Sequence, residues 1–284
     1  MPRESNNELA ALQLLRWYAE MGVDAAISET PADWFAQSKK PLSPRRTDDR
    51  QTPHRANLSA PSPAPKSGAG LRATPEMPMA PDAAIMASRE KARSAATLDE
   101  LRETLAGFDG CGLKATAKNM CFARGNADAD VMFIGEAPGR DEDLQGLPFV
   151  GRAGHLLDKM LASIGLSEET AYVTNIVYWR PPGNRTPTPQ ESQVCLPFLE
   201  RQVELVDPKI VVFLGGAAAK QMFNTTVGIM RLRGKWRTYS TSEKDYKAIA
   251  TLHPAYLLRT PVAKRQVWRD LIQIKLALDT PADD

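Results

Sequence analysis

Residues 131–139 read VMFIGEAPG, and this stretch decides the fold class. Four consecutive apolar residues that end in a turn rich in glycine and proline are typical of a strand buried on both faces. Related patterns follow at AYVTNIVY (171–178), KIVVFLGG (209–216) and KAIATLHP (247–254). Continuous apolar strands of this kind belong to parallel sheets that helices cover on both faces.

Helical patterns separate these strands. The first begins after Thr97, which stands as an N-cap with Glu100 at the capping-box position. The alternation of strands and helices predicts an α/β fold, in which ligands bind at the carboxyl ends of the strands. The other helices are expected at Gly154–Ile164, Thr188–Val206, residues 217–223 and Val262–Leu278.

The composition divides the chain into regions. Residues 1–35 carry apolar side chains at helical spacing, so we expect an N-terminal helical segment there. Residues 36–94 are expected to form a disordered Pro/Ala-rich linker, because nine prolines fall within residues 41–81 and little apolar surface accompanies them. A compact domain is expected at 95–278, with a tail at 279–284. Two interpretations of the N-terminal helix stay open: it docks a partner protein, or it folds back on the domain.

Charge, cysteine content and hydropathy limit the class of protein. Residues 226–275 contain eleven lysines and arginines and three acids, a local charge of +8 that can attract phosphate backbones; a solvated cationic surface is the simpler alternative. Three cysteines do not make a disulfide framework. Because no apolar run is long enough to span a membrane and the N-terminus is too polar for a signal peptide, we expect a cytoplasmic protein without a membrane partner.

The turn GEAPG lets the backbone approach a ligand closely, because glycine has no side chain. It lacks the G-x-G-x-x-G spacing of dinucleotide sites and the Gly-Lys-Ser/Thr ending of a phosphate-binding loop. Acids that include Glu136 and Glu142 gather beside it. Phe149 is an aromatic residue in a loop, where it can stack on a base. An ordinary strand-to-helix turn is the alternative interpretation.

Two polar residues accompany other strands. His253 follows an apolar strand, and Pro254 fixes the chain direction after it. Asn175 lies inside the apolar run AYVTNIVY, where its amide needs hydrogen-bond partners. Its donor and acceptor match the polar edge of uracil. The alternatives are that His253 is a structural histidine and that Asn175 bonds loop backbone.

Arg180 and Arg185 flank a Pro-Pro-Gly turn. Two interpretations stay open: this turn contacts phosphate, or it only stiffens the connection.

Taken together, five motifs resemble family 4 of the uracil-DNA glycosylase superfamily. The resemblance covers roughly residues 98–278. It implies a three-layer α/β/α fold with a central four-stranded parallel sheet, and hydrolysis of the bond between uracil and deoxyribose, which leaves an abasic site. The motifs, in the order of the family, are GEAPGRDEDLQGLPFVGRAG, TNIVYWRPPGNRTP, LGGAAAK, RLRGKW and HPAYLLR.

The resemblance also implies roles for individual residues. Phe149 would stack on the flipped uracil, Asn175 would bond its polar edge, and His253 would donate toward uracil O2. Glu136 and Glu142 are both candidates for holding the attacking water or stabilising the sugar cation. The residues implied to line the uracil pocket with backbone are Gly135 and Ala137. Those implied or expected to contact DNA are Arg180, Arg185, Arg231, Arg233 and Arg259.

Family 4 enzymes usually bind a 4Fe–4S cluster through four cysteines, and here this chain departs from the family. Cys111 and Cys195 match two of those positions, but Phe108 and Trp179 stand at the other two. Such clusters need four thiolates in most cases. We therefore expect no cluster, no metal and no other cofactor, with the two aromatic residues filling the space.

We expect a monomer that acts on uracil-containing DNA as a monofunctional glycosylase. A non-catalytic protein that binds uracil or abasic DNA on the same fold is the main alternative. A hydrolase of small nucleotides is disfavoured, because the cationic segment 226–275 suits a longer phosphate backbone better.

Overall fold

The computed structural model describes residues 81–280. The predicted N-terminal helix at 1–35, the part of the predicted linker at 36–80 and the end of the tail at 281–284 lie outside these residues. None of the helices between residues 81 and 280 has the length and the apolar character needed to span a membrane.

The core of the fold is a six-stranded mixed sheet with the strand order β1-β3-β2-β4-β6-β5. The four strands β3, β2, β4 and β6 run parallel, as predicted, and Phe133 of β2 pairs with Val173 on one side and Val212 on the other. The strands are β1 Arg124–Gly125, β2 Val131–Gly135, β3 Tyr172–Asn175, β4 Ile210–Leu214, β5 Trp236–Ser240 and β6 Asp245–Thr251.

Two antiparallel edge strands, β1 and β5, extend the predicted four-stranded sheet. Neither could be recognised from an apolar run. The strand β1 has two residues, and β5 reads WRTYS, in which only Tyr239 is buried. The sheet is therefore wider than predicted, although its parallel centre agrees with the expectation.

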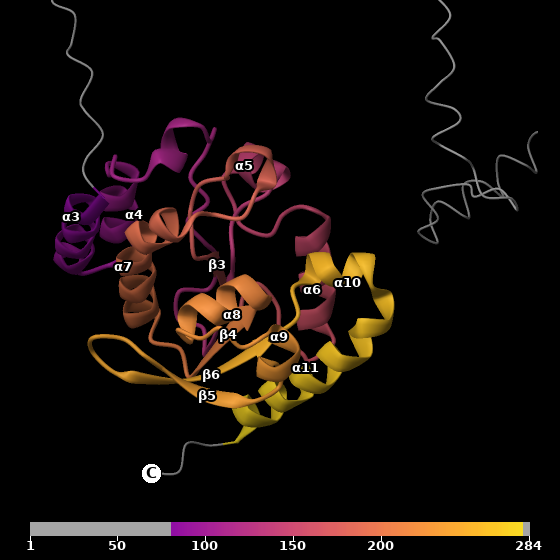
Figure 1. Cartoon of the computed structure of the whole chain (residues 1–284). Helices are drawn as coiled ribbons and strands as arrows, with labels where there is room; N and C mark the ends of the chain where they lie inside the picture. Colours follow the sequence, from indigo (N-terminus) through magenta and orange to yellow (C-terminus); the bar gives the residue numbers. More distant parts are fainter. Residues whose placement is uncertain (1–80, 281–284) are drawn as a thin grey trace, which may run out of the picture. The chain divides into compact units, whose positions relative to one another are not determined.

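Helices cover both faces of the sheet (Figure 1). Met132 and Ile134 point into a core shared with α4, α7 and α8, whereas Val131 and Phe133 point into a core shared with α6, α10 and α11. The helices are α3 Pro81–Ser94, α4 Leu98–Ala106, α5 Arg140–Gln145, α6 Arg152–Ala162, α7 Pro189–Val206, α8 Gly216–Met222, α9 Ile229–Leu232, α10 Pro254–Arg259 and α11 Lys264–Asp279, and the 3-10 turns are η1 Gly112–Ala115, η2 Pro182–Asn184 and η3 Pro261–Ala263.

The start of α4 follows the capping residue read from the sequence, and α7 begins with a cap that the structure adds. Thr97 caps α4, and its hydroxyl accepts a hydrogen bond from the Glu100 amide at 3.2 Å. Thr188 and Glu191 form a reciprocal capping box at α7, with Pro189 in the first turn. These local signals fix where the covering helices begin.

The prediction of a linker that reaches residue 94 was wrong for its last part, because residues 81–94 form helix α3. Ala84, Ser88 and Ala92 are at most 2% exposed and stand four residues apart, so they form one narrow face that packs against α7. Small side chains carry little hydrophobicity in a composition average, yet they allow close helix packing. The prediction from proline and apolar content therefore missed helix α3.

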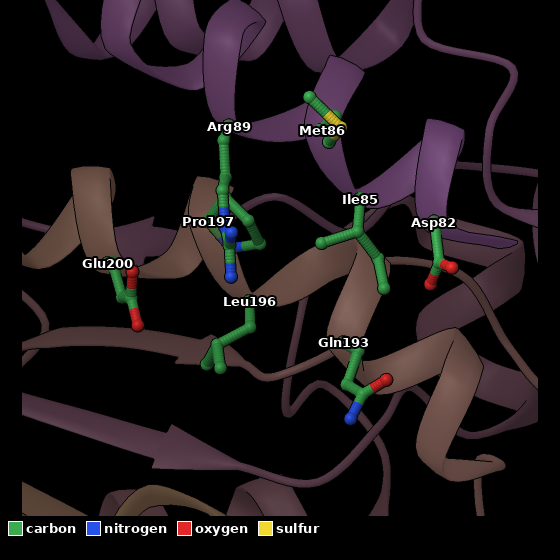
Figure 2. Close-up of a pocket in the computed structure, with 8 residues that line it drawn as sticks. All are labelled: Asp82, Ile85, Met86, Arg89, Gln193, Leu196, Pro197 and Glu200. Carbon is green, nitrogen blue, oxygen red and sulfur yellow. The ribbon is translucent and has the colours of Figure 1, made fainter.

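A groove of about 450 Å³ lies between α3 and α7 (Figure 2). Ile85 of α3 and Leu196 of α7 line it, and Arg89 and Glu200 contribute opposite charges. Pro197 removes one backbone hydrogen bond from α7 at this point, because it has no N–H to donate to the carbonyl of Gln193. The groove therefore lies between α3 and α7 where α7 lacks one backbone hydrogen bond, and its lining is partly apolar and partly charged.

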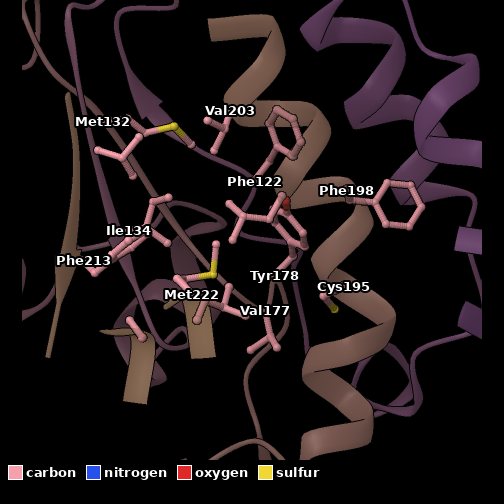
Figure 3. Close-up of a cluster of buried hydrophobic side chains, with 14 of the residues drawn as sticks. Phe122, Met132, Ile134, Val177, Tyr178, Cys195, Phe198, Val203, Phe213 and Met222 are labelled. Atoms are coloured by element: carbon pink, nitrogen blue, oxygen red, sulfur yellow. The ribbon is translucent and has the colours of Figure 1, made fainter. Parts of the chain in front are cut away.

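The larger core cluster includes Tyr178, Phe198 and their apolar neighbours (Figure 3). A buried polar network lies among them. Gln202 of α7 accepts a hydrogen bond from the Tyr178 hydroxyl at 2.9 Å and donates one to the Tyr172 hydroxyl oxygen at 2.8 Å. Thr174 donates to the carbonyl of Phe122 at 2.6 Å. This network joins α7 to β3, and it thereby supports the strand that ends in the candidate site residue Asn175.

Replacement of Gln202 by alanine is expected to lower the free energy of unfolding by roughly 2–4 kcal/mol, because it leaves two buried tyrosine hydroxyls without their partner and opens a cavity. Urea denaturation followed by circular dichroism measures the change. The matched control is Gln193→Ala, which alters an exposed glutamine on the same helix. Equal midpoints for the two variants would contradict a stabilising network.

Candidate active site

The candidate site lies at the carboxyl ends of the parallel strands. Gly135 ends β2 and pairs with Asn175, the last residue of β3, and His253 follows β6 by two residues. The strands β3 and β4 lie on opposite sides of β2, so the winding of the sheet reverses there. Ligands of α/β sheets bind at such a switch point.

Close contact at Gly135 brings two of the predicted residues together. A Cβ atom on Gly135 would lie 2.4 Å from Asn175 Oδ1 and 2.5 Å from Cζ of Phe149. The backbone of Gly154 supports the Phe149 loop equally closely, since a Cβ there would lie 1.7 Å from the Phe149 carbonyl oxygen. These distances show that only glycine permits this arrangement at either position.

Phe149 adopts an unusual backbone conformation for an aromatic residue, with φ of 55°. A left-handed conformation outside glycine stores strain and is retained where surrounding structure holds it. Here it directs the ring toward Gly135 and places it 5.5 Å from the His253 ring, with an interplanar angle of 31°. The loop after β2 therefore presents an aromatic face at the strand ends.

His253 is the N-cap of α10, and its Nδ1 accepts a hydrogen bond from the Ala255 amide at 3.1 Å. The proton of the neutral ring must then sit on Nε2, which becomes a donor. Burial, with a smaller contribution from the Arg259 charge, lowers the pKa of His253 to about 4. The ring is therefore a neutral donor at physiological pH.

Two buried acceptors at the site have no hydrogen-bond partner within the described chain. They are Asn175 Oδ1, on a residue that is 1% exposed, and Glu136 Oε1. Burial also raises the pKa of Glu136. Because buried polar atoms are nearly always paired, both acceptors indicate a place where a ligand or water donates a hydrogen bond.

The structure assigns Glu142 a different environment from Glu136. Glu142 accepts hydrogen bonds from the amide of Gly139 at 3.1 Å and from the amide of Gly151 at 2.8 Å. It thereby joins the start of α5 to the chain that enters α6. Asp143 is also occupied, since it accepts from the Lys118 amide at 2.7 Å. These acids hold loop backbone, whereas Glu136 retains an open acceptor.

Four of the five predicted DNA-contacting arginines fall into two groups. Arg185 is paired with Glu191 by two hydrogen bonds of 2.8 and 2.6 Å, and Arg180 donates to Asn184 at 2.6 Å. Arg231 and Arg259 are exposed and have no ion pair among residues 81–280. The second group is free to meet phosphates.

Arg233 belongs to a buried network that sequence reasoning missed. Asp270 of α11 is 1% exposed and accepts hydrogen bonds from Arg233 at 2.5 and 3.1 Å and from Thr251 at 2.6 Å. Arg233 also donates to the Gln266 carbonyl. The network holds the loop after α9 against the end of β6. The sequence did contain one signal for this network: Asp270 is an acid at an apolar-face position of the helix predicted at Val262–Leu278, where a buried carboxylate needs a partner.

The cysteine positions do not form a four-cysteine cluster site. The sulfur atoms of Cys111 and Cys195 lie 3.9 Å apart. Phe108 and Trp179, at most 3% exposed, belong to the same apolar cluster, and Phe108 packs on Phe198 with ring centroids 5.2 Å apart. Residues 81–280 contain no group of three or more His, Cys, Asp or Glu side chains that could hold a metal. The residues present therefore do not fit an iron–sulfur cluster.

The lowered pKa of His253 predicts a pH-dependent stability. An unfolded histidine titrates near ~6.5, so between about pH 6.5 and 4 the unfolded chain binds a proton that the folded chain excludes. The stabilisation is complete above about pH 6.5 and is lost as the pH falls toward 4. Wild type should lose roughly 2–3 kcal/mol more than His253→Gln across this window in urea denaturation. His155→Gln should keep the wild-type slope, and a wild-type slope in His253→Gln would refute the assignment.

Comparison with known proteins agrees with this geometry. Residues 122–272 match the model of the uracil DNA glycosylase superfamily. A type-4 uracil-DNA glycosylase of Archaeoglobus fulgidus is 42% identical over 184 residues, which cover 63% of this chain and 92% of the relative. Another, from Sulfurisphaera tokodaii, is 36% identical over 190 residues, 65% of this chain and 86% of the relative. The type-4 uracil-DNA glycosylase of Thermotoga maritima is 41% identical over 150 residues, 52% and 77% of the two chains. This chain belongs to the uracil-DNA glycosylase superfamily.

Proposed function

We propose that the protein is a DNA repair glycosylase that hydrolyses the N-glycosidic bond of uracil flipped out of DNA and leaves an abasic site. The observation that carries the proposal is the arrangement of Phe149, His253 and the unpaired Oδ1 of Asn175 around the bare backbone of Gly135. These groups offer a stacking surface, a neutral donor and a buried acceptor in one place, which is what a flipped pyrimidine requires.

Recognition of uracil follows from these groups. The face of Phe149 stacks on the flat base, and Asn175 Oδ1 accepts the hydrogen bond of uracil N3–H. The Asn175 amide nitrogen donates to the neighbouring O4. Because the acceptor is already desolvated at 1% exposure, binding a base without a matching donor would leave it unpaired at a cost of about 1–3 kcal/mol. Gly135 and Ala137 line the pocket with backbone.

Hydrolysis breaks the C1′–N1 bond, and negative charge develops on uracil while positive charge develops on the sugar. His253 donates from Nε2 toward uracil O2 and stabilises that negative charge without a proton leaving the ring. Water adds to C1′, its proton passes to solvent, and the departing base takes up a proton from solvent. A hydrogen-bond donor aimed at developing charge typically contributes a factor of about 10²–10³ in rate.

Glu136 is the better candidate of the two acids for holding the attacking water. Its open Oε1 can accept a hydrogen bond from water, and as a carboxylate it also stabilises the positive sugar. Both oxygens of Glu142 already accept backbone hydrogen bonds. We therefore assign Glu142 to positioning of the pocket loop and Glu136 to the reaction.

DNA binding is proposed to rest mainly on Arg231 and Arg259, which are exposed and have no ion pair among residues 81–280. Arg233, the residue directly after α9, anchors the helix that carries Arg231. Arg180 and Arg185 hydrogen-bond around the Pro-Pro-Gly turn, and we propose that their charge also attracts a nearby DNA strand. The catalytic domain is proposed to begin with α3 rather than at residue 95. Three buried free cysteines support a reducing, cytoplasmic location, and we propose a monomer.

The decisive experiment incubates the protein with uracil-containing single- and double-stranded oligonucleotides and then cleaves abasic sites with alkali. Wild type should produce strand breaks at uracil. His253→Ala and Asn175→Ala should each slow release by about 10²–10³-fold, because each removes one contact to the base or its developing charge. His155→Ala, a change at an exposed histidine, should retain the wild-type rate. DNA binding without any release would instead establish a non-catalytic reader of uracil or abasic DNA.

We also propose that the domain folds without an iron–sulfur cluster. Protein produced in iron-supplemented medium and purified without oxygen should be colourless, with no band near ~400 nm and no bound iron, because two of the four thiolates that such clusters need are replaced by buried aromatic rings. Absorbance spectra and iron analysis measure this. A brown protein with stoichiometric iron would contradict it.

A further inference from the structure

A second groove lies between α6, α10 and α11 and encloses about 360 Å³. Most of its lining is apolar and comes from three helices that pack on one face of the sheet. A volume of this size accommodates one or two large apolar side chains. The apolar lining residues are Leu156, Met160, Leu257, Val267, Trp268 and Leu271.

The polar lining of this groove is cationic. Lys159, Lys264 and Arg265 stand at its rim, Ser163 completes it, and no acid lines it. None of the three cations makes an ion pair or a hydrogen bond with another part of residues 81–280, whereas Lys275 further along α11 pairs with Asp279 at 3.3 Å. The rim therefore carries positive charge that the described chain does not neutralise.

The apolar surface continues out of the groove along α11. Trp268 is 46% exposed, Ile272 is 38% exposed and Leu276 is 61% exposed, and the three stand four residues apart on one helix face. Single exposed apolar residues are ordinary, but an aligned row beside an apolar groove forms a contiguous surface. Tryptophan in particular is enriched among residues that dominate protein–protein binding energy.

We propose that this groove docks an acidic segment of a partner protein that inserts apolar side chains. The cationic rim favours aspartate and glutamate, and the apolar floor favours leucine or an aromatic residue, so the two features together select an amphipathic acidic peptide. A DNA backbone would satisfy the rim but would leave the apolar floor and Trp268 without a matching surface. The proposal concerns a surface separate from the uracil pocket and does not depend on the proposed reaction.

The groove is connected to the candidate active site through α10. His253 caps this helix and Arg259 ends it, while Leu257 between them forms part of the groove floor. Gly135, Phe149, Asn175 and His253 are not among the residues that line the groove, so a partner seated at Trp268 and the rim cations need not cover the uracil pocket. The surface therefore suits recruitment of the protein by a partner while the strand ends remain accessible to DNA.

The test uses the full-length protein and a fluorescein-labelled acidic peptide that carries leucine and phenylalanine at helical spacing, followed by fluorescence anisotropy. Saturable binding is expected. Trp268→Ser and Arg265→Glu should each weaken it by about tenfold or more, because each removes an anchor or reverses a rim charge. The control is Met86→Ser, which alters an exposed apolar residue on α3, a helix that packs on α7 and does not line this groove. This control should bind like wild type.

Two further probes separate the contributions. A peptide with serine in place of the apolar residues, and one with lysine in place of the acids, should both bind poorly. Trp268→Ser should release uracil from a short oligonucleotide at the wild-type rate. No saturable binding of the acidic apolar peptide, or equal binding to Trp268→Ser, would overturn the proposal. Competition by a uracil-free oligonucleotide, with weakened DNA binding in Arg265→Glu, would also overturn it and identify the groove as a DNA contact.

Discussion

The missing side chain of Gly135 is the constraint on which the candidate site depends. It permits Asn175 and Phe149 to approach the end of β2 within distances that a Cβ atom would block. The left-handed conformation of Phe149 and the close fit of Gly154 beneath it serve the same end, because they hold an aromatic ring over bare backbone. The absent Cβ of Gly135, the positive φ of Phe149 and the close fit of Gly154 therefore all shape the same pocket at the carboxyl ends of the strands.

Around the candidate site, residues of the same type have different roles because they have different hydrogen-bond partners. Glu142 holds backbone while Glu136 keeps an open acceptor, and Arg233 serves a buried carboxylate while Arg231 faces solvent. His253 owes its donor direction to the helix it caps, since the Ala255 amide occupies Nδ1. Residue type alone would have assigned the members of each pair the same role.

The sequence predicted what depends on local pattern. The four parallel strands followed from continuous apolar runs, and the start of α4 followed from Thr97. Helix α3 and strand β5 escaped prediction because small residues and a half-exposed edge carry a weak apolar signal. The partners of Asp143 and Asp270 depend on contacts between segments far apart in the chain, which no local pattern encodes.

Phe108 and Trp179 are buried aromatic residues at two of the four positions where the resemblance to family 4 implies cluster cysteines. A core that is filled by the chain's own side chains needs no cofactor, so folding alone produces the final structure and no other protein has to deliver a cluster. On the cluster-free proposal, the abundance of the folded protein would be independent of iron supply. Oxidants that dismantle exposed clusters would also spare it, so the capacity to remove uracil would persist under the conditions in which DNA damage is heaviest.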